Sequence, residues 1–286
     1  MQKLIHQAQQ GFLTIAQNTS TVDYLRLAYV QAMSIKITMP GSLYAIVVDK
    51  ETLELITDKH RKVFDYIITI KNDTAIDSDW KLNNEWQVFH LTPFKETIKL
   101  ESDLIFTRDI SHWWHAFRLR NIVLSTGCRD YQQNISFTRH YRQLFDSNNL
   151  PDIYTGLMYF RYTQEATNFF SLAEQIFRNW DYISKSVLLN CYDNQPTTDV
   201  VYSLTTKILG EEHCTIPSMD WINFVHMKPK VNNWPDTPWH KLVMCETDIP
   251  MIRINNVNQY HPLHYYEKTW VTDELISEYE SCLQKS

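Results

Sequence analysis

The sequence predicts an α/β fold built on a largely parallel β-sheet, and three observations support it. Apolar runs of strand length alternate with a helical pattern in the first part of the chain, which is the order of right-handed βαβ units. The run Leu43–Val48 is almost continuously apolar, as in parallel strands covered on both faces. Hydrophobic residues make up 44% of the 286 residues, enough for a sizeable core. We therefore expect one domain over 1–286 with a smaller C-terminal half.

The first part of the chain is expected to hold four strands and one long helix. Short apolar runs predict the strands, and a polar loop, 17–21, follows the first of them. Few positions of the helix are polar, so most of its surface should be buried. The predicted strands are 11–16, 43–48, 63–70 and 97–100, and the predicted helix is 23–36.

The second part is less regular. An aromatic-rich helix comes first, and the long helix that starts near Thr197 should end at Gly210, which follows its C-cap. Thr272 is expected to cap the last helix. Regular patterning fades between 226 and 272. The predicted helices are 111–120, 164–180, 197–210 and 272–283, and the predicted strands are 157–160 and a short one ending at His226.

Composition excludes several classes of protein. The chain has 5 Gly and neither G-x-G-x-x-G nor G-K-[ST], so a dinucleotide-binding loop and a P-loop both lack their signature. Five Cys without a C-x-x-C pair favour reduced thiols in a cytoplasm over a disulfide framework or zinc cluster. The net charge of −6 argues against holding nucleic acid by overall charge. Neither a signal peptide nor a transmembrane segment is evident, so a cytoplasmic protein without membrane attachment is expected.

Polar side chains stand at the carboxyl ends of the predicted strands. Asn18, Asp49, Glu101 and Asp103 all lie there, and ligands of open α/β sheets bind beyond those ends. Glu101 and Asp103 are two apart on extended chain, so their carboxylates point to the same side. A divalent cation that also binds substrate phosphates would relieve their repulsion. The alternative is an exposed acidic strand end without a ligand.

The segment around this acidic pair resembles a known motif. Phe94-Lys-Glu-Thr-Ile-Lys-Leu-Glu-Ser-Asp-Leu-Ile105 is similar to the metal-binding DxD strand of GT-A-fold glycosyltransferases, especially glycogenin-like enzymes of glycosyltransferase family eight. Glu101 stands where that family has Asp. The resemblance implies a GT-A-like fold with helices flanking a mixed sheet. It also implies sugar transfer from a nucleotide diphosphate sugar, uridine-based, to a hydroxyl. Mn²⁺ or Mg²⁺ would be held by Glu101 and Asp103, with Asp103 acting in catalysis.

Further blocks resemble the same family in the same order. Gln17 and Asn18 resemble the loop that holds the nucleotide, and Asp49, beyond the next strand, is expected beside them. Tyr154-Thr155-Gly156 resembles the strand that lines the donor sugar, although Tyr154 replaces an Asn. The resemblance thus divides the chain into a nucleotide-binding half, 11–105, and a half for donor sugar and acceptor, 106–286.

The block around His226 resembles the His and Lys-Pro-Trp motif of the family. It implies that His226 is a metal ligand and that Lys228 or Lys230 holds the diphosphate. Alternatively, His226 is a core histidine and the lysines are solvated. Asp199 resembles the first residue of an Asp-Gln segment that contacts the sugar, without the Gln. Asp199 is also the candidate base if the enzyme inverts configuration.

Segments 18–29, 110–114 and 149–154 resemble glycosyltransferases encoded by T-even-like tailed phages. That resemblance implies glucose or arabinose as the sugar, 5-hydroxymethylcytosine in phage DNA as the acceptor, and the host cytoplasm as the location. The stretch 108–142 carries six Arg, no Lys and two acids, a net charge of +4, among aromatic rings, as nucleic-acid binding requires. The candidate DNA contacts in it are Arg118, Arg120, Trp113 and Trp114.

Three alternatives remain open at this point. The stretch 108–142 is otherwise an aromatic core segment with solvated Arg on its outer face. The acceptor is otherwise a glycan or a small molecule. Because Glu101 and Tyr154 stand where the resembled family has other residues, the chain is otherwise a catalytically inactive module that binds sugar or nucleic acid on the same fold.

Overall fold

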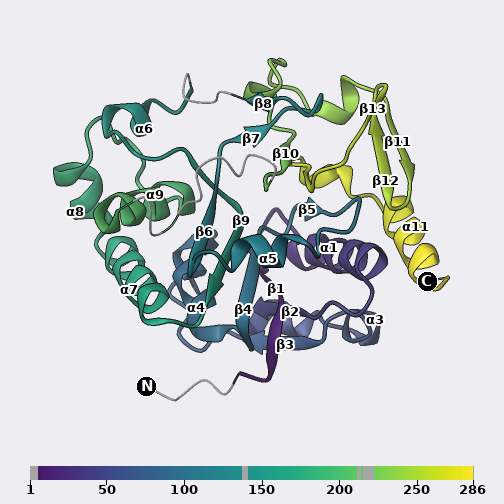
Figure 1. The fold of residues 1–286 in the computed structure, drawn as a ribbon, viewed down its shortest axis with the longest axis horizontal. Helices are drawn as coiled ribbons and strands as arrows, with labels where there is room; N and C mark the ends of the chain where they lie inside the picture. The colour runs from purple at the N-terminus through teal and green to yellow at the C-terminus, as the bar shows by residue number, and fades with distance from the viewer. Residues whose placement is uncertain (1–5, 137–140, 211–213, 215–221, 286) are drawn as a thin grey trace.

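The computed structural model describes residues 6–136, 141–210, 214 and 222–285 (Figure 1). Its centre is a six-stranded mixed sheet, as the sequence predicts. The first three strands and β4 run parallel, whereas β9 pairs antiparallel with both β4 and β6. The strands, in spatial order, are β3 (Tyr66–Thr69), β2 (Tyr44–Val48), β1 (Ala8–Ile15), β4 (Phe94–Leu100), β9 (Ile153–Arg161) and β6 (Ile122–Thr126).

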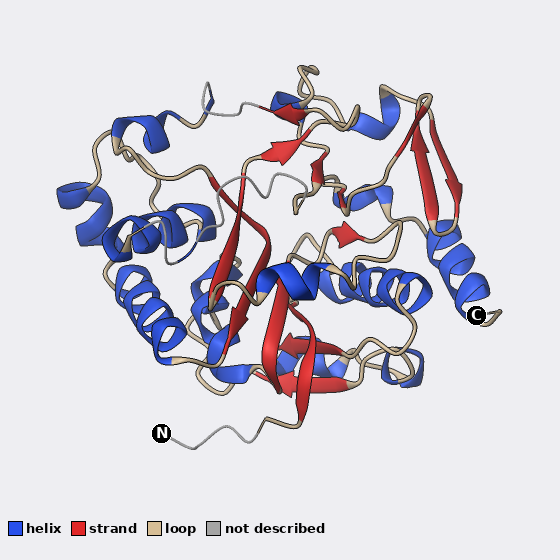
Figure 2. Ribbon diagram, in the orientation of Figure 1, coloured by secondary structure: helices blue, strands red, loops and turns tan. Residues whose placement is uncertain are grey.

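Helices cover both faces of this sheet, which therefore has a core on each side (Figure 2). Because side chains alternate along a strand, Phe12 and Leu13 of β1 belong to different cores. The core that contains Phe12 is covered by α1 (Tyr24–Thr38), and α11 (Asp273–Leu283) packs against α1. The core that contains Leu13 is covered by α7 (Gln164–Arg178) and α9 (Thr198–Leu209).

The long helices begin and end close to the predicted residues. Asp23 caps α1 by accepting a hydrogen bond from the Arg26 backbone, and Thr272 caps α11 in the same way. Gly210 ends α9 with a φ of 96°, a conformation that glycine adopts without strain. The shorter helices are α2 (Lys50–Glu54), α3 (Asp58–Arg61), α4 (Val88–Leu91), α5 (Trp113–Phe117), α6 (Gln143–Ser147) and α8 (Trp180–Tyr182), together with 3₁₀ helices at Lys81–Gln87, Pro229–Val231, Trp239–Lys241 and Lys268–Trp270 and a π-helix at Ile183–Val187.

Two further sheets were not predicted, although the short strand that ends at His226 was. Their strands are mostly two to four residues long, too short for a periodic pattern to show in the sequence. One sheet has the order β5 (Leu104–Ile105), β14 (Leu263–His264), β10 (Val225–His226), β7 (Cys128–Arg129) and β8 (Ile135–Ser136). The other has the order β11 (Cys245–Asp248), β12 (Met251–Ile254) and β13 (Val257–Asn258). The first of these sheets brings the C-terminal part of the chain beside the end of β4.

Candidate functional site

A cavity of about 660 Å³ lies at the carboxyl ends of β1 and β4. Residues of both the 11–105 and the 106–286 parts of the chain line it. Its position agrees with the rule that ligands bind beyond the carboxyl ends of parallel strands. Its volume falls in the range of pockets that hold small molecules.

The acidic turn that follows β4 forms part of the cavity wall, and a buried glutamine of α1 holds it in place. Gln31 Nε2 donates to the backbone oxygens of Glu101 and Leu104, at 2.5 and 2.6 Å. Gln31 Oε1 accepts from Thr14 Oγ1 at 2.5 Å and from the Tyr44 hydroxyl at 2.8 Å. The amide thus ties the turn to two strands of the sheet.

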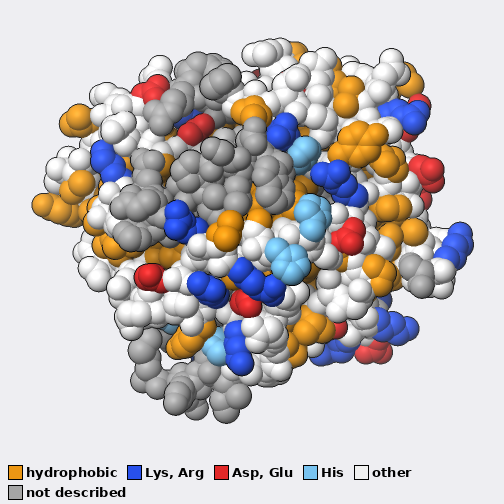
Figure 3. All heavy atoms as spheres, viewed as in Figure 1, with side chains coloured by type: hydrophobic (Ala, Val, Ile, Leu, Met, Phe, Trp, Pro, Cys, Tyr) orange, Lys and Arg blue, Asp and Glu red, His pale blue; other side chains and the backbone are white. Residues whose placement is uncertain are grey.

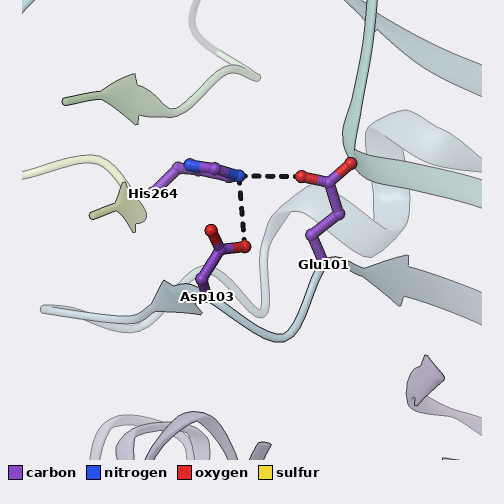
Figure 4. Close-up of side chains that lie close together, drawn as sticks. All are labelled: Glu101, Asp103 and His264. Atoms are coloured by element: carbon purple, nitrogen blue, oxygen red, sulfur yellow. Dashed lines mark hydrogen bonds and ion pairs between the residues drawn. The ribbon is translucent and has the colours of Figure 1, made fainter. Parts of the chain in front are cut away.

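Glu101 and Asp103 meet a histidine, as the resemblance implies, but it is His264 (Figure 4). His264 Nε2 lies 2.7 Å from Glu101 Oε2 and 3.2 Å from Asp103 Oδ1. One ligand atom from each residue lies within 4.8 Å of the others. Burial opposes charge on both side chains, yet the carboxylates raise the pKa of His264 and the imidazole holds the pKa of Glu101 well below its usual range. This is a candidate cation site.

His226 lies beside this cluster and is not one of its three members. It pairs with His264 in register across the parallel strands β10 and β14, and the two ring centroids are 4.4 Å apart. Burial lowers the pKa of His226 well below its ordinary value. The structure therefore places His226 on the cavity wall in contact with the ring of a candidate ligand.

Lys268 is a second residue that the sequence analysis missed. Its ammonium pairs with Asp103 Oδ2 and donates to the backbone oxygen of Tyr266 at 2.9 Å. The segment His264-Tyr-Tyr-Glu-Lys268-Thr-Trp270 contains His, Lys and Trp in the order of the resembled motif. The block at 225–230 lacks the Trp, so this difference was the signal that could have identified His264 and Lys268.

Asp199, at the start of α9, is fixed next to the acidic cluster. Its Oδ1 accepts from the backbone nitrogen and the hydroxyl of Thr155, both at 2.8 Å, and its Oδ2 accepts from Arg142 Nη2 at 3.1 Å. Thr155 Oγ1 also lies 3.1 Å from Glu101 Oε1. Burial raises the pKa of Asp199, and the Arg142 guanidinium opposes this rise. Asp199, Thr155 and Glu101 thus form one continuous piece of the cavity wall.

Tyr154 and Gly156 line the cavity on either side of Thr155. The Tyr154 hydroxyl lies 2.8 Å from the Tyr141 hydroxyl, and Arg142 stacks on the Tyr154 ring at 4.1 Å. A Cβ at position 156 would lie 2.9 Å from Phe224 Cζ, so only glycine fits there without displacing the ring. All three residues of this block therefore lie on the cavity wall.

The two lysines of the 225–230 block differ in their surroundings. Lys228 lines the cavity, burial lowers its pKa, and within the described ranges it makes no ion pair. Its Nζ lies 5.4 Å from the centroid of the Tyr141 ring. Lys230 is exposed and is not on the cavity wall, although its Nζ lies 5.8 Å from the same centroid. Lys228 is therefore the lysine of this block that faces the cavity.

Of the three residues predicted to hold the nucleotide, Gln17 lines the cavity, whereas Asn18 and Asp49 do not. Gln17 Nε2 donates to Asp49 Oδ2 at 3.1 Å, and Asp49 caps α2 by accepting from the Thr52 backbone at 2.8 Å. Asn18 Oδ1 accepts from the Leu25 backbone at 2.9 Å, so Asn18 holds the start of α1. Asn18 and Asp49 stand behind the wall and position it.

The predicted DNA contacts are not at this site. Trp113 and Trp114 are 0% and 5% exposed, so the prediction that they stack on a base is wrong: both are core residues. Arg118 pairs with Glu96 at 2.7 Å near the amino end of β4, away from the cavity. Arg120 is exposed. Residues Phe137 and Arg139 of the same stretch lie outside the described residues.

The surface agrees with this correction. Figure 3 shows Lys and Arg side chains interspersed with acidic, hydrophobic and histidine side chains on the viewed face, not gathered into one continuous basic patch. The alternative of an aromatic core segment with Arg on its outer side therefore describes α5 and its neighbours.

Comparison with protein-family models and with curated proteins gives no match. Among solved structures, the chain is similar to the galactosyltransferase LgtC in complex with donor and acceptor sugar analogs, with a TM-score of 0.56, 10% identity, and coverage of 96% of this chain and 95% of that chain. It is also similar to the apo form of the glycosyltransferase GlyE of Streptococcus pneumoniae TIGR4, with a TM-score of 0.52, 12% identity, and coverage of 97% and 62%. The fold is that of GT-A glycosyltransferases. None of the helices described here is both long and apolar enough to span a bilayer.

Proposed function

We propose that this chain is a metal-dependent glycosyltransferase that uses a nucleotide diphosphate sugar. The carrying observation is the cluster of Glu101, Asp103 and His264 on the wall of the cavity, in a fold shared with glycosyltransferases. An acidic turn at the end of a strand is common in proteins. Here it is held by a buried amide and joined by a histidine from a distant part of the chain.

The residues present fit a divalent cation. Two carboxylate oxygens and one imidazole nitrogen are ligands that Mn²⁺ accepts, and the nitrogen favours Mn²⁺ over Mg²⁺. Three protein ligands leave coordination positions for substrate oxygens. A bound cation would neutralise charge on the diphosphate leaving group.

Other residues of the cavity have roles that follow from their positions. Lys228, which makes no ion pair among the residues with described positions, would stabilise the negative charge of the departing diphosphate. Asp199 is held by Thr155 and Arg142, so its carboxylate would orient hydroxyls of the donor sugar. Gln17 would contact the nucleotide.

Asp199 has a second proposed role, as the base of an inverting reaction. Its three donors within the chain favour orientation of the sugar over proton transfer, because each stabilises the carboxylate. The anomeric configuration of the product, measured by proton NMR, decides between the two. A retained configuration excludes the base role.

Thermal unfolding with uridine diphosphate, with and without Mn²⁺, tests the proposal, followed by donor hydrolysis. We expect the nucleotide to raise the unfolding temperature only when Mn²⁺ is present, and we expect slow release of free sugar. Nucleotide binding without turnover on any donor would favour the inactive binding module. If the protein binds neither a nucleotide nor a nucleotide sugar, the proposed glycosyltransferase function is refuted.

The acceptor is a separate part of the proposal. 5-Hydroxymethylcytosine in phage DNA, with glucose or arabinose as the sugar and the host cytoplasm as the location, follows only from the sequence resemblance. Transfer assays with hydroxymethylated DNA, unmodified DNA and simple glycans would decide. Transfer of sugar to glycans alone would exclude DNA as the acceptor, but the proposed use of a nucleotide sugar as donor would stand.

A further inference from the structure

One buried carboxylate on the cavity wall has no role in the function proposed above. Glu85, on the 3₁₀ helix Lys81–Gln87, is 4% exposed and lines the cavity. Its Oε2 lies 2.8 Å from Lys99 Nζ, and Lys99 is 0% exposed. Neither Glu85 Oε2 nor Lys99 Nζ makes a hydrogen bond to a described residue, so the ion pair alone joins them. The buried carboxylate therefore has a counter-charge, but its Oε2 has no hydrogen-bond donor among the described residues.

Such a pair is costly to keep for stability alone. Removing two charges from water opposes folding, and well-packed apolar residues often replace a buried ion pair without loss. Buried polar atoms in folded proteins almost always have a partner. A buried carboxylate that lacks a hydrogen bond and lies on the wall of a cavity therefore points to a hydrogen-bond donor on a ligand.

The position of Glu85 indicates which part of the ligand this is. Lys99 precedes Glu101 by two residues, and the Glu101 backbone continues the β4 ladder by donating to Gly156 O at 3.0 Å. Side chains two apart on extended chain share a side. Glu85 and Lys99 thus lie on the side of β4 that carries Glu101 and, through Thr155, Asp199. Asn84, the residue before Glu85, donates to Gln17 Oε1 at 3.0 Å, so Glu85 lies between Asp199 and the nucleotide end.

We propose that Glu85 determines which sugar is transferred, by accepting a hydrogen bond from one hydroxyl of the donor sugar. Lys99 is the positioning residue that keeps this carboxylate charged. The pair selects a neutral sugar with a free hydroxyl at that position and rejects a sugar acid, whose carboxylate the charge of Glu85 repels. This inference rests on the proposed function.

The test compares donors with and without each hydroxyl. Kinetics of the parent protein would be measured with uridine diphosphate glucose, its single deoxy analogues and uridine diphosphate glucuronate, and again with galactose and xylose donors. We expect one deoxy analogue to lose roughly 10- to 100-fold in kcat/KM, the value of a hydrogen bond to a charged group. In Glu85→Gln/Lys99→Met, that penalty should fall by about 5- to 10-fold, because the amide oxygen still accepts a hydrogen bond but without charge, while Mn²⁺-dependent binding of uridine diphosphate is unchanged.

The test depends on which variants are compared. The single Glu85→Gln change leaves Lys99 buried without a counter-charge and risks misfolding, so the double variant is the informative one. Glu96→Gln makes the same chemical change on β4 far from the cavity and should leave every donor ratio as in the parent.

The outcomes separate this inference from the function on which it rests. A deoxy penalty that persists in the double variant, or a parent that penalises no deoxy donor, overturns the role of Glu85 while the transferase stands. A parent that turns over no nucleotide sugar overturns both.

Discussion

The two ends of strand β4 both carry acidic residues, in different surroundings. Near the amino end, Glu96 is satisfied within the chain: it accepts from Gln9 at 2.8 Å, Arg118 at 2.7 Å and the Tyr159 hydroxyl at 3.2 Å. At the carboxyl end, Glu101 and Asp103 crowd around one imidazole on the wall of a cavity. A carboxylate whose counter-charge and hydrogen bonds come from the chain supports the fold. Glu101 and Asp103 also have partners in the chain, His264 and Lys268, but all four side chains lie on the wall of a cavity, where a ligand can reach them.

The largest effect is expected from a substitution beyond the carboxyl end of β4. Asp103→Asn removes a charged ligand, and we expect donor hydrolysis to fall about 10³-fold, because metal stabilisation of a leaving group is worth several kcal/mol. Initial rates at saturating Mn²⁺ check this. Glu96→Gln is the matched control and should keep at least about half of the parent rate. Equal rates for Asp103→Asn and the parent would remove the metal role.

The next comparison separates the two histidines. His264→Ala removes a candidate ligand, whereas His226→Ala removes only a ring that packs on it. Loss of an outer contact costs metal affinity about 10- to 100-fold, so we expect about 10-fold for His226→Ala and more than about 100-fold for His264→Ala. Titration calorimetry with Mn²⁺ measures both. The reverse order would restore His226 as the ligand implied by the sequence resemblance.

The paired lysines allow a similar comparison. Lys228→Met should lower kcat for donor hydrolysis about 100-fold, since one preorganised charged donor at a leaving group is worth that much. Lys230→Met is the same substitution at a lysine that lies beside the same Tyr141 ring but does not line the cavity. It should change kcat less than about 3-fold. A loss in both variants would indicate a general electrostatic effect in place of direct contact.

The smallest effect is expected from a substitution at Arg120, just before strand β6. Arg120→Glu reverses an exposed charge remote from the cavity, and we expect the free energy of unfolding to change by no more than about 0.5 kcal/mol. Donor hydrolysis should also be unchanged. Weaker transfer to hydroxymethylated DNA in this variant, with normal hydrolysis, would instead bring back the DNA contact predicted from the sequence.

The main sheet and part of the site could be predicted because their signals are local. Buried strands and long helices carry apolar patterns, and the polar residues that follow β4 stand at the edge where ligands bind. Glu101, Asp103 and Thr155 all lie on or just beyond long strands. For these residues, the position of the strand in the sequence already indicates that the side chain lies at the edge of the sheet where ligands bind.

The remaining site residues depend on contacts that no local pattern encodes. His264 reaches the acidic turn through β14, a strand of two residues with no periodicity to read. Asn18 and Asp49 follow the expected strands, but polar residues there can face a ligand or support a helix. Asp49 caps α2, and Asn18 accepts from the Leu25 backbone at the start of α1. Trp114 lies in a basic, aromatic stretch whose composition is the same whether its rings are buried or exposed.

Gln31 has a consequence for anyone who would rebuild this site on another scaffold. Its single amide bridges two strands and both sides of the acidic turn, so the geometry of the turn is stored in a helix about seventy residues earlier in the chain. A transplant of the segment 94–105 alone would carry the ligands without their alignment. Replacement by Glu, the product of deamidation, exchanges both amide protons for a buried charge facing two backbone oxygens. Deamidation of Gln31 alone would therefore misalign the site, although every candidate ligand would still be present in the sequence.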